Sequence, residues 1–267
     1  MQIHTLPAMT GWRWVSGGFR LLRRQPVALL ALTFLNLVLL SVSSVVPLIG
    51  PLLPMVLSPV FAVGLMHGMR CADGGGMPTP WMLFEGFRVN EGRAWKPLLL
   101  LGVLNAAATL GALSLAALVD GGTLLELAAG SAAPDAAPPI GDSLVMAVLV
   151  FLLAYTPVQI AFWYAPLFVA WHGIGVGKAL FFSYVAVLRN LRAFVVYAAG
   201  WFALGLVVSL AIQALVVALQ GSALLLSWLL SPLSLIALAA LYCSFWPTYR
   251  DAVAAPGQEP EREPLEP

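Results

Sequence analysis

Charged residues are scarce in this chain. Asp, Glu, Lys and Arg make up 9% of its 267 residues, whereas soluble domains carry about 25%. The apolar set AVILMFWYC accounts for 61% of the chain, above the about 45–50% of soluble domains. Water cannot solvate most of a surface this poor in charge, so an ordinary soluble globular protein is excluded. The composition indicates a membrane protein.

Long stretches lack charge altogether. A transmembrane helix needs about 20 apolar residues, so the two longest stretches each have room for two crossings. Pro47, Gly50 and Pro51 interrupt the first, because proline removes a backbone donor and glycine frees the backbone. Polar residues at 220–222 interrupt the last. The runs without Lys, Arg, Asp or Glu are residues 27–69, 97–119, 143–170 and 193–246.

We therefore predict an all-α fold, a polytopic membrane helix bundle with about six transmembrane helices in three hairpins and short interfacial amphipathic helices. A single transmembrane domain over residues 1–250 precedes a disordered cytoplasmic tail over 251–267. The first apolar run exceeds the usual length in a signal peptide, so we expect its helix to be kept as an anchor. The predicted spans are about 27–46, 54–70, 97–119, 143–170, 193–219 and 223–247.

All basic residues fall on one side of this topology. The predicted turns at 47–53, 120–142 and 220–222 contain none of the 13 Lys and Arg residues. Under the positive-inside rule the basic side is cytoplasmic. We therefore expect a multi-pass protein of the bacterial inner membrane with both termini in the cytoplasm and Pro51 at an extracytoplasmic hairpin tip.

Aromatic and basic residues occur together just before each predicted hairpin, in segments 11–26, 80–97 and 177–194. In the first segment, apolar residues recur with helical spacing while Arg13, Arg20 and Arg24 occupy another face, which predicts an interfacial amphipathic helix. The three segments suggest an internal repeat, although compositional bias can produce the same likeness. The candidate lipid-interface residues are Trp12, Arg13, Arg20, Arg23, Arg24, Arg88, Lys178, Arg189 and Arg192.

Two interpretations of these segments are open. In ordinary anchoring, Trp and Arg only hold helix ends at the lipid headgroups. In the second interpretation, the segments dock on anionic lipid or on a cytosolic partner. Membrane lipids, anionic ones included, are the expected partners. A protein partner or a homo-oligomer is an open alternative, and no nucleic acid is expected.

Constellations for catalysis or metal binding are missing from the sequence. No predicted span interior contains a charge, and intramembrane charges usually mark proton relays and ion paths. The glycine run after Asp73 neither follows a strand nor opens a helix with Lys, so we interpret it as a connector. Cys71 and Cys243 are expected to be buried or interfacial thiols, and a metal or redox pair is the alternative. We expect no enzyme activity, catalytic residue, metal or cofactor.

Four amide side chains lie inside the predicted spans. Such amides commonly form hydrogen bonds between helices. The alternative is a polar cavity for a solute, favoured by Pro157 and Pro166, which would kink the fourth span and expose carbonyls. The amides in question are Asn36, Asn105, Gln159 and Gln213.

Three segments, "GFRLLRRQP", "VPLIGPLLPMVLSPVFAVGL" and "FWPTYRD", carry a resemblance that covers the chain up to about residue 251. With them the chain resembles an uncharacterised family of six-helix inner-membrane proteins of proteobacteria. This resemblance implies no active-site residues. More distantly, the repeated pattern is similar to membrane domains attached to some bacterial glycerophosphodiester phosphodiesterases, which implies proximity to lipid at most.

Two classes of function follow from these observations. The preferred one is a non-enzymatic lipid-associated or membrane-assembly component, because the basic segments flank uncharged spans. The alternative is a small-solute transporter or a transport-related subunit that uses uncharged polar groups and kinked helices.

Overall fold

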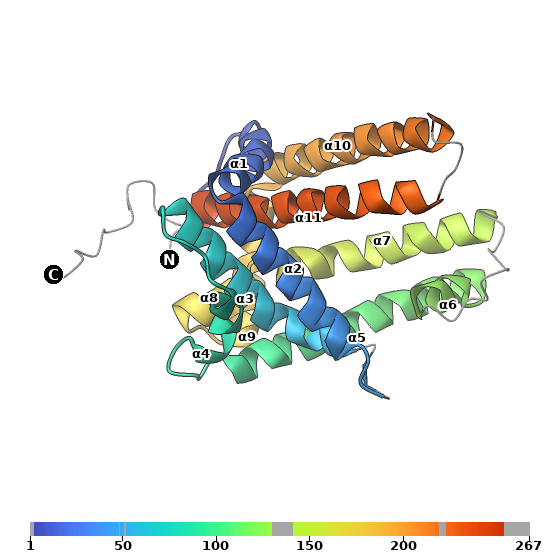
Figure 1. Ribbon diagram of the computed structural model, residues 1–267. Helices are drawn as coiled ribbons and strands as arrows, with labels where there is room; N and C mark the ends of the chain where they lie inside the picture. Colours follow the sequence, from blue (N-terminus) through green and yellow to red (C-terminus); the bar gives the residue numbers. More distant parts are fainter. Residues whose placement is uncertain (1–2, 48, 51, 130–140, 219–222, 254–267) are drawn as a thin grey trace. The chain divides into compact units, whose positions relative to one another are not determined.

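The structure is a computed structural model that describes residues 3–47, 49–50, 52–129, 141–218 and 223–253. Within these ranges it contains helices and no β-strand (Figure 1), which confirms the predicted all-α fold class. The elements are α1 (Thr10–Arg24), α2 (Pro26–Ser43), α3 (Leu53–Asp73), the 3-10 helix η1 (Pro80–Phe84), α4 (Glu85–Arg88), α5 (Trp95–Asp120), α6 (Thr123–Ala129), α7 (Asp142–Phe162), α8 (Ala165–His172), α9 (Val176–Arg189), α10 (Leu191–Ala218) and α11 (Ala223–Val253).

Six stretches of helix among the described residues are long and apolar enough to cross a membrane. They correspond to the six predicted spans, and they make the chain a multi-pass membrane protein. Basic helix α1 is not among them. The candidate spans are Pro26–Ser43, Leu53–Asp73, Trp95–Asp120, Asp142–His172, Leu191–Val216 and Leu230–Val253.

The chain divides into two compact units. Unit 1 contains Met1–Leu37, Gly64–Leu83 and Ala186–Pro267, and unit 2 contains Val38–Val63 and Phe84–Val185. Helices α2, α3 and α9 each contribute one part to each unit. The single transmembrane domain predicted over residues 1–250 stays a prediction.

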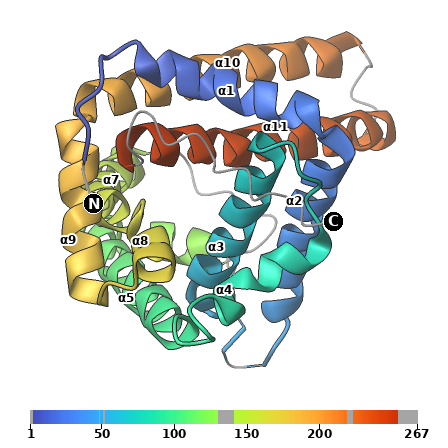
Figure 2. The same cartoon turned by 90° about the vertical axis from the view of Figure 1, so that its left-hand side faces the viewer.

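In unit 1, helix α1 packs across α10 and α11 (Figures 1 and 2). The side chain of Trp14 is fully buried there, and its ring centroid lies 5.2 Å from that of Phe194. A Cβ on Gly11 would collide with the backbone of α10, and one on Gly18 would lie 2.6 Å from the carbonyl oxygen of Ala240. Residues without bulky side chains let helix backbones approach closely. Protein contacts therefore determine the position of α1.

The start of the described chain is held at the junction of α9 and α10. Asn190 accepts the Leu6 N–H at 2.9 Å through Oδ1 and donates from Nδ2 to the His4 carbonyl at 2.8 Å. The His4 N–H in turn donates to the carbonyl of Ala252 at 3.0 Å. The N-terminal segment and the end of α11 therefore lie side by side.

In unit 2, α5 packs against α6, α7 and α8. The span predicted over 143–170 consists of two helices, α7 and α8, and Pro166 lies in the first turn of α8, where the missing N–H of proline needs no helical partner. Ser183 of α9 bridges the break. Its hydroxyl accepts the Tyr164 N–H at 2.9 Å and donates to the Ile160 carbonyl at 3.1 Å, so a side chain replaces the lost bond between backbone groups.

Other segments differ from the predicted boundaries. Helix α6 was not predicted and lies in the predicted turn 120–142. Residues 251–253 of the predicted disordered tail continue α11 instead, because Val253 is buried and Asp251 is hydrogen-bonded in unit 1. Some of the predictions concern residues that the structure does not describe. They are the hairpin tip at Pro51, much of two predicted turns and the rest of the tail. The residues concerned are 48, 51, 130–140, 219–222 and 254–267.

Candidate functional site

A cleft in unit 1 contains three of the nine candidate lipid-interface residues. Arg13, Arg20 and Arg24 lie along one side of α1, as their spacing predicts, and all three line the cleft. Arg88 and Lys178 belong to unit 2. The candidates that do not line the cleft are Trp12, Arg23, Arg88, Lys178, Arg189 and Arg192.

The cleft has a volume of about 450 Å³ and lies among α1, the last residue of α3 and the later turns of α11. Both α3 and α11 are candidate spans, and the cleft adjoins the C-terminal part of each. It therefore lies where spans end rather than halfway along them. Its lining residues are Arg13, Gly17, Arg20, Leu21, Arg24, Asp73, Trp246, Pro247, Arg250 and Asp251.

Asp73 is the centre of a hydrogen-bond network in this cleft. Its Oδ1 accepts from Arg24 Nη1 at 2.9 Å, and its Oδ2 accepts from Arg250 Nη1 at 2.9 Å. Trp246 also donates from Nε1 to Oδ2, at 2.8 Å. The carboxylate thereby connects α1, α3 and α11, and its charge is balanced by two guanidinium groups.

Asp251 is satisfied in the same way. Its Oδ1 accepts from Arg250 Nε at 3.0 Å, and its Oδ2 accepts from Trp14 Nε1 at 3.0 Å. Trp14 is buried, so this bond gives a partner to an indole N–H that water cannot reach. Both carboxylates of the cleft are therefore engaged with groups of the protein itself.

The other two arginines of the cleft, Arg13 and Arg20, do not take part in this network. Neither Arg13 nor Arg20 has a side-chain hydrogen bond or an ion pair with any described residue, and both side chains are exposed. The cleft holds four guanidinium groups and two carboxylates, so it has an excess of two positive charges. The cleft can therefore accept an anion without first breaking the network around Asp73.

Sequence reasoning found one side of this cleft and missed the other. Asp73 was interpreted only as the start of a glycine-rich connector, and Arg250 was counted only as one of the basic residues on one side. A signal was present, since "FWPTYRD" (245–251) contains Trp246, Arg250 and Asp251 within two consecutive helical turns. The pairing of these residues with Arg24, however, joins positions far apart in sequence.

A second polar cleft, of about 460 Å³, lies in unit 2 near the loop that precedes α5. Asn90 there donates from Nδ2 to the Ala170 carbonyl at 2.7 Å, which satisfies an acceptor at the end of α8. Arg93 pairs with Glu91 at 2.8 Å, and both side chains are about 80% exposed. The charges of this cleft are thus already paired and largely in solvent.

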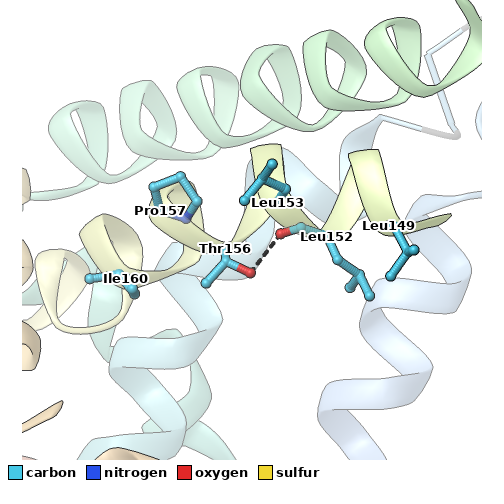
Figure 3. A pocket seen from close by; sticks show the side chains of 6 residues that line it. All are labelled: Leu149, Leu152, Leu153, Thr156, Pro157 and Ile160. Carbon is cyan, nitrogen blue, oxygen red and sulfur yellow. Dashed lines mark hydrogen bonds between the residues drawn. The ribbon is translucent and has the colours of Figure 1, made fainter. Parts of the chain in front are cut away.

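A third recess, of about 520 Å³, lies along α7 (Figure 3). Leucines, Ile160 and Pro157 line it, and its one side-chain polar group, the hydroxyl of Thr156, donates to the carbonyl of Leu152 at 2.6 Å. The only side-chain donor that lines the recess is therefore already used within the helix.

The amides predicted to join helices behave differently from that prediction. The Oδ1 atoms of Asn36 and Asn105 are buried and have no hydrogen-bond partner. For these two oxygens the predicted interhelical bond is absent. The structure gives no side-chain hydrogen bond for Gln159 or Gln213 among the described residues.

No group of three or more His, Cys, Asp and Glu side chains in the described part of the chain could hold a metal ion. Cys71 is half-buried and Cys243 is buried, and neither forms a disulfide bond. The polar groups that line the cleft around Asp73 are arginine guanidinium groups, an indole N–H and two carboxylates.

Comparison with known proteins identifies a relative. The chain is 40% identical over 262 residues to a probable inner membrane protein of Burkholderia thailandensis, and the match covers 97% of this chain and 96% of the relative. No protein-family model matches the chain. No solved structure matches it either. With this identity over nearly the whole of both chains, and with six candidate spans, the chain belongs to the family of this probable inner membrane protein.

Proposed function

We propose that the chain is a non-enzymatic component of the bacterial inner membrane that associates with anionic lipid, alone or within a membrane assembly. The observation that carries the proposal is the pair of unengaged arginines, Arg13 and Arg20, in a cleft beside the ends of two candidate spans. Phosphates of lipid headgroups are the anions that lie at this level of a bilayer. Basic residues near an anionic surface gain about 1 kcal/mol each.

The proposal includes an orientation in which both termini and the cleft lie in the cytoplasm. All 13 basic residues fall on one side of the six-span topology, and such residues are retained in the cytoplasm during insertion. The hydrogen bond between His4 and Ala252 is consistent with both ends of the chain lying on one side.

Cysteine labelling tests this orientation. Ile49 is exposed and lies in the predicted outer turn, so Ile49→Cys in a Cys71→Ala/Cys243→Ala background should react with a membrane-impermeant maleimide on spheroplasts. A cysteine at Arg23, on the opposite side of the predicted topology, should react only after the cells are lysed. The reverse pattern would refute the orientation.

Lipid association is tested by extracting the protein from bacterial membranes with a styrene–maleic acid copolymer, which keeps the surrounding lipid. We expect the ratio of phosphatidylglycerol and cardiolipin to phosphatidylethanolamine to exceed that of the bulk membrane. Replacing Arg13, Arg20, Arg23 and Arg24 together by Gln should reduce the enrichment. A lipid composition equal to that of the bulk membrane around the unmodified protein would refute the proposal.

The other hypotheses from the sequence make different predictions. Movement of a solute by the purified protein in liposomes would support the small-solute transporter instead. The distant similarity to membrane domains of glycerophosphodiester phosphodiesterases stays a hypothesis and adds no residue to the proposal.

A further inference from the structure

The four arginines of the cleft in unit 1 form two pairs that differ in their bonding to the carboxylates. Arg24 and Arg250 are bonded to Asp73, and Arg250 is also bonded to Asp251. Arg13 and Arg20 line the same cleft without an ion pair to any described residue. The first pair therefore neutralises the carboxylates that would otherwise repel an anion, and the second pair supplies the positive charge that can attract one.

Arg13, Gly17 and Arg20 occupy successive turns on one face of α1. The two arginines are seven residues apart, which corresponds to about 10.5 Å along the helix axis. Gly17 lies between them and has no side chain to fill the space. A Cβ on Gly17 would lie 3.3 Å from Cγ of Pro247, so α11 closely approaches α1 at this point. The two long side chains can thus converge above a floor formed by Gly17 and Pro247.

The charge of this site fits a phosphate group. Arginine binds phosphate oxygens through two parallel N–H groups, which gives geometric specificity as well as attraction. A phosphodiester carries a single negative charge, and a phosphate monoester carries about −1.5 to −2 at pH 7. The excess of two positive charges in the cleft can neutralise either.

We propose that this cleft is a specific binding site for one phosphate group, held by Arg13 and Arg20 over Gly17, while Asp73 holds Arg24 and Arg250 in place. A phospholipid headgroup and a soluble phosphate ester share this chemistry. The lipid source rests on the proposed function, whereas the phosphate site itself does not. The ends of candidate spans α3 and α11 beside the cleft favour the lipid headgroup.

The test compares two variants that lose the same charge. Arg13→Gln/Arg20→Gln removes the proposed ligands of the phosphate. Arg93→Gln/Lys96→Gln is the matched control, because it removes two exposed positive charges that do not line the cleft and are not candidate lipid-interface residues. A third variant, Arg13→Lys/Arg20→Lys, keeps the charge and loses the paired N–H donors. Correct folding of each variant is checked by size-exclusion chromatography and helical circular dichroism, and Arg20→Gln alone replaces the double variant if that one does not fold.

Each purified protein is first titrated with phosphatidylglycerol in detergent and analysed by native mass spectrometry. We expect one tightly bound lipid for each chain, with affinity reduced by about tenfold in Arg13→Gln/Arg20→Gln, since two charge-assisted hydrogen-bonding groups are lost from an exposed site. The matched control should bind like the unmodified protein, and the lysine variant should fall between the two.

A second arm uses glycerol 3-phosphate and inorganic phosphate as soluble probes and measures thermal stabilisation. Stabilisation that depends on Arg13 and Arg20, without selective lipid binding, would support the phosphate site and assign it a soluble ligand. Equal losses in the cleft variant and in the matched control, or no loss in either, would overturn the site. In that case anionic lipid enriched around the extracted protein would still leave the proposed function standing.

Discussion

Replacing Asp73 by alanine tests whether the network in the cleft holds unit 1 together. The two ion pairs involve half-exposed arginines, with side-chain exposures of 51% for Arg24 and 47% for Arg250, and pairs of this kind contribute about 0.2–1 kcal/mol each. The bond from Trp246 Nε1 reaches a charged acceptor and contributes about 1.5–3 kcal/mol. Removal of the carboxylate from the last residue of α3 should by itself increase the free energy of unfolding by about 0.3–1 kcal/mol, because the helix dipole disfavours negative charge there.

These contributions give an expected loss of about 1–5 kcal/mol in the free energy of unfolding for Asp73→Ala. The loss is measured by reversible denaturant titration in mixed micelles, followed by circular dichroism and by the fluorescence of tryptophan. Glu91→Ala is the matched control, because it removes the same charge from an ion pair that is about 80% exposed, and it should change stability by less than about 1 kcal/mol. If Asp73→Ala destabilises the protein no more than Glu91→Ala does, the network does not stabilise unit 1.

Two further predictions concern the contacts that position α1 and the N-terminal segment. Gly18→Ala should destabilise unit 1 by about 1–3 kcal/mol through overpacking. Gly205→Ala, where a Cβ would meet no atom within 4 Å, should be neutral or stabilising in the same micelle titration. Equal effects of the two substitutions would contradict the close approach of α1 and α11. Asn190→Ala removes the hydrogen bonds to Leu6 and His4, so amide hydrogen exchange in the N-terminal peptide should become faster. The control variant Asn105→Ala should leave this exchange unchanged. If Asn190→Ala also leaves it unchanged, Asn190 does not anchor the N-terminal segment.

The six spans could be predicted because the length and composition of an apolar run directly determine whether it can cross a bilayer. The points at which these spans bend or break could not be predicted. Pro166 marks the fourth span as irregular, but the break becomes tolerable only because Ser183, on another helix, bonds to both Tyr164 and Ile160. Periodicity along one segment contains no information about such a partner.

Helix α1 shows the same limit for the candidate site. Its spacing correctly separated Arg13, Arg20 and Arg24 from an apolar face. Sequence reasoning then placed that apolar face at the membrane interface, whereas two of its residues, Val15 and Leu22, are buried in unit 1. An amphipathic pattern predicts which face of a helix is apolar and leaves open whether lipid or protein covers it.

The burial of the apolar face of α1 changes how its basic face can act. A peripheral amphipathic helix would have to insert its apolar side into the bilayer and become ordered in order to bind lipid. Here the contacts of Gly11 and Gly18 with α10 and α11 already hold α1 in place. Arg13 and Arg20 therefore project from a fixed backbone, and only their side chains lose freedom when an anion binds. Preorganisation of this kind lowers the entropic cost of binding, which favours recognition of one phosphate group over diffuse attraction to a charged surface.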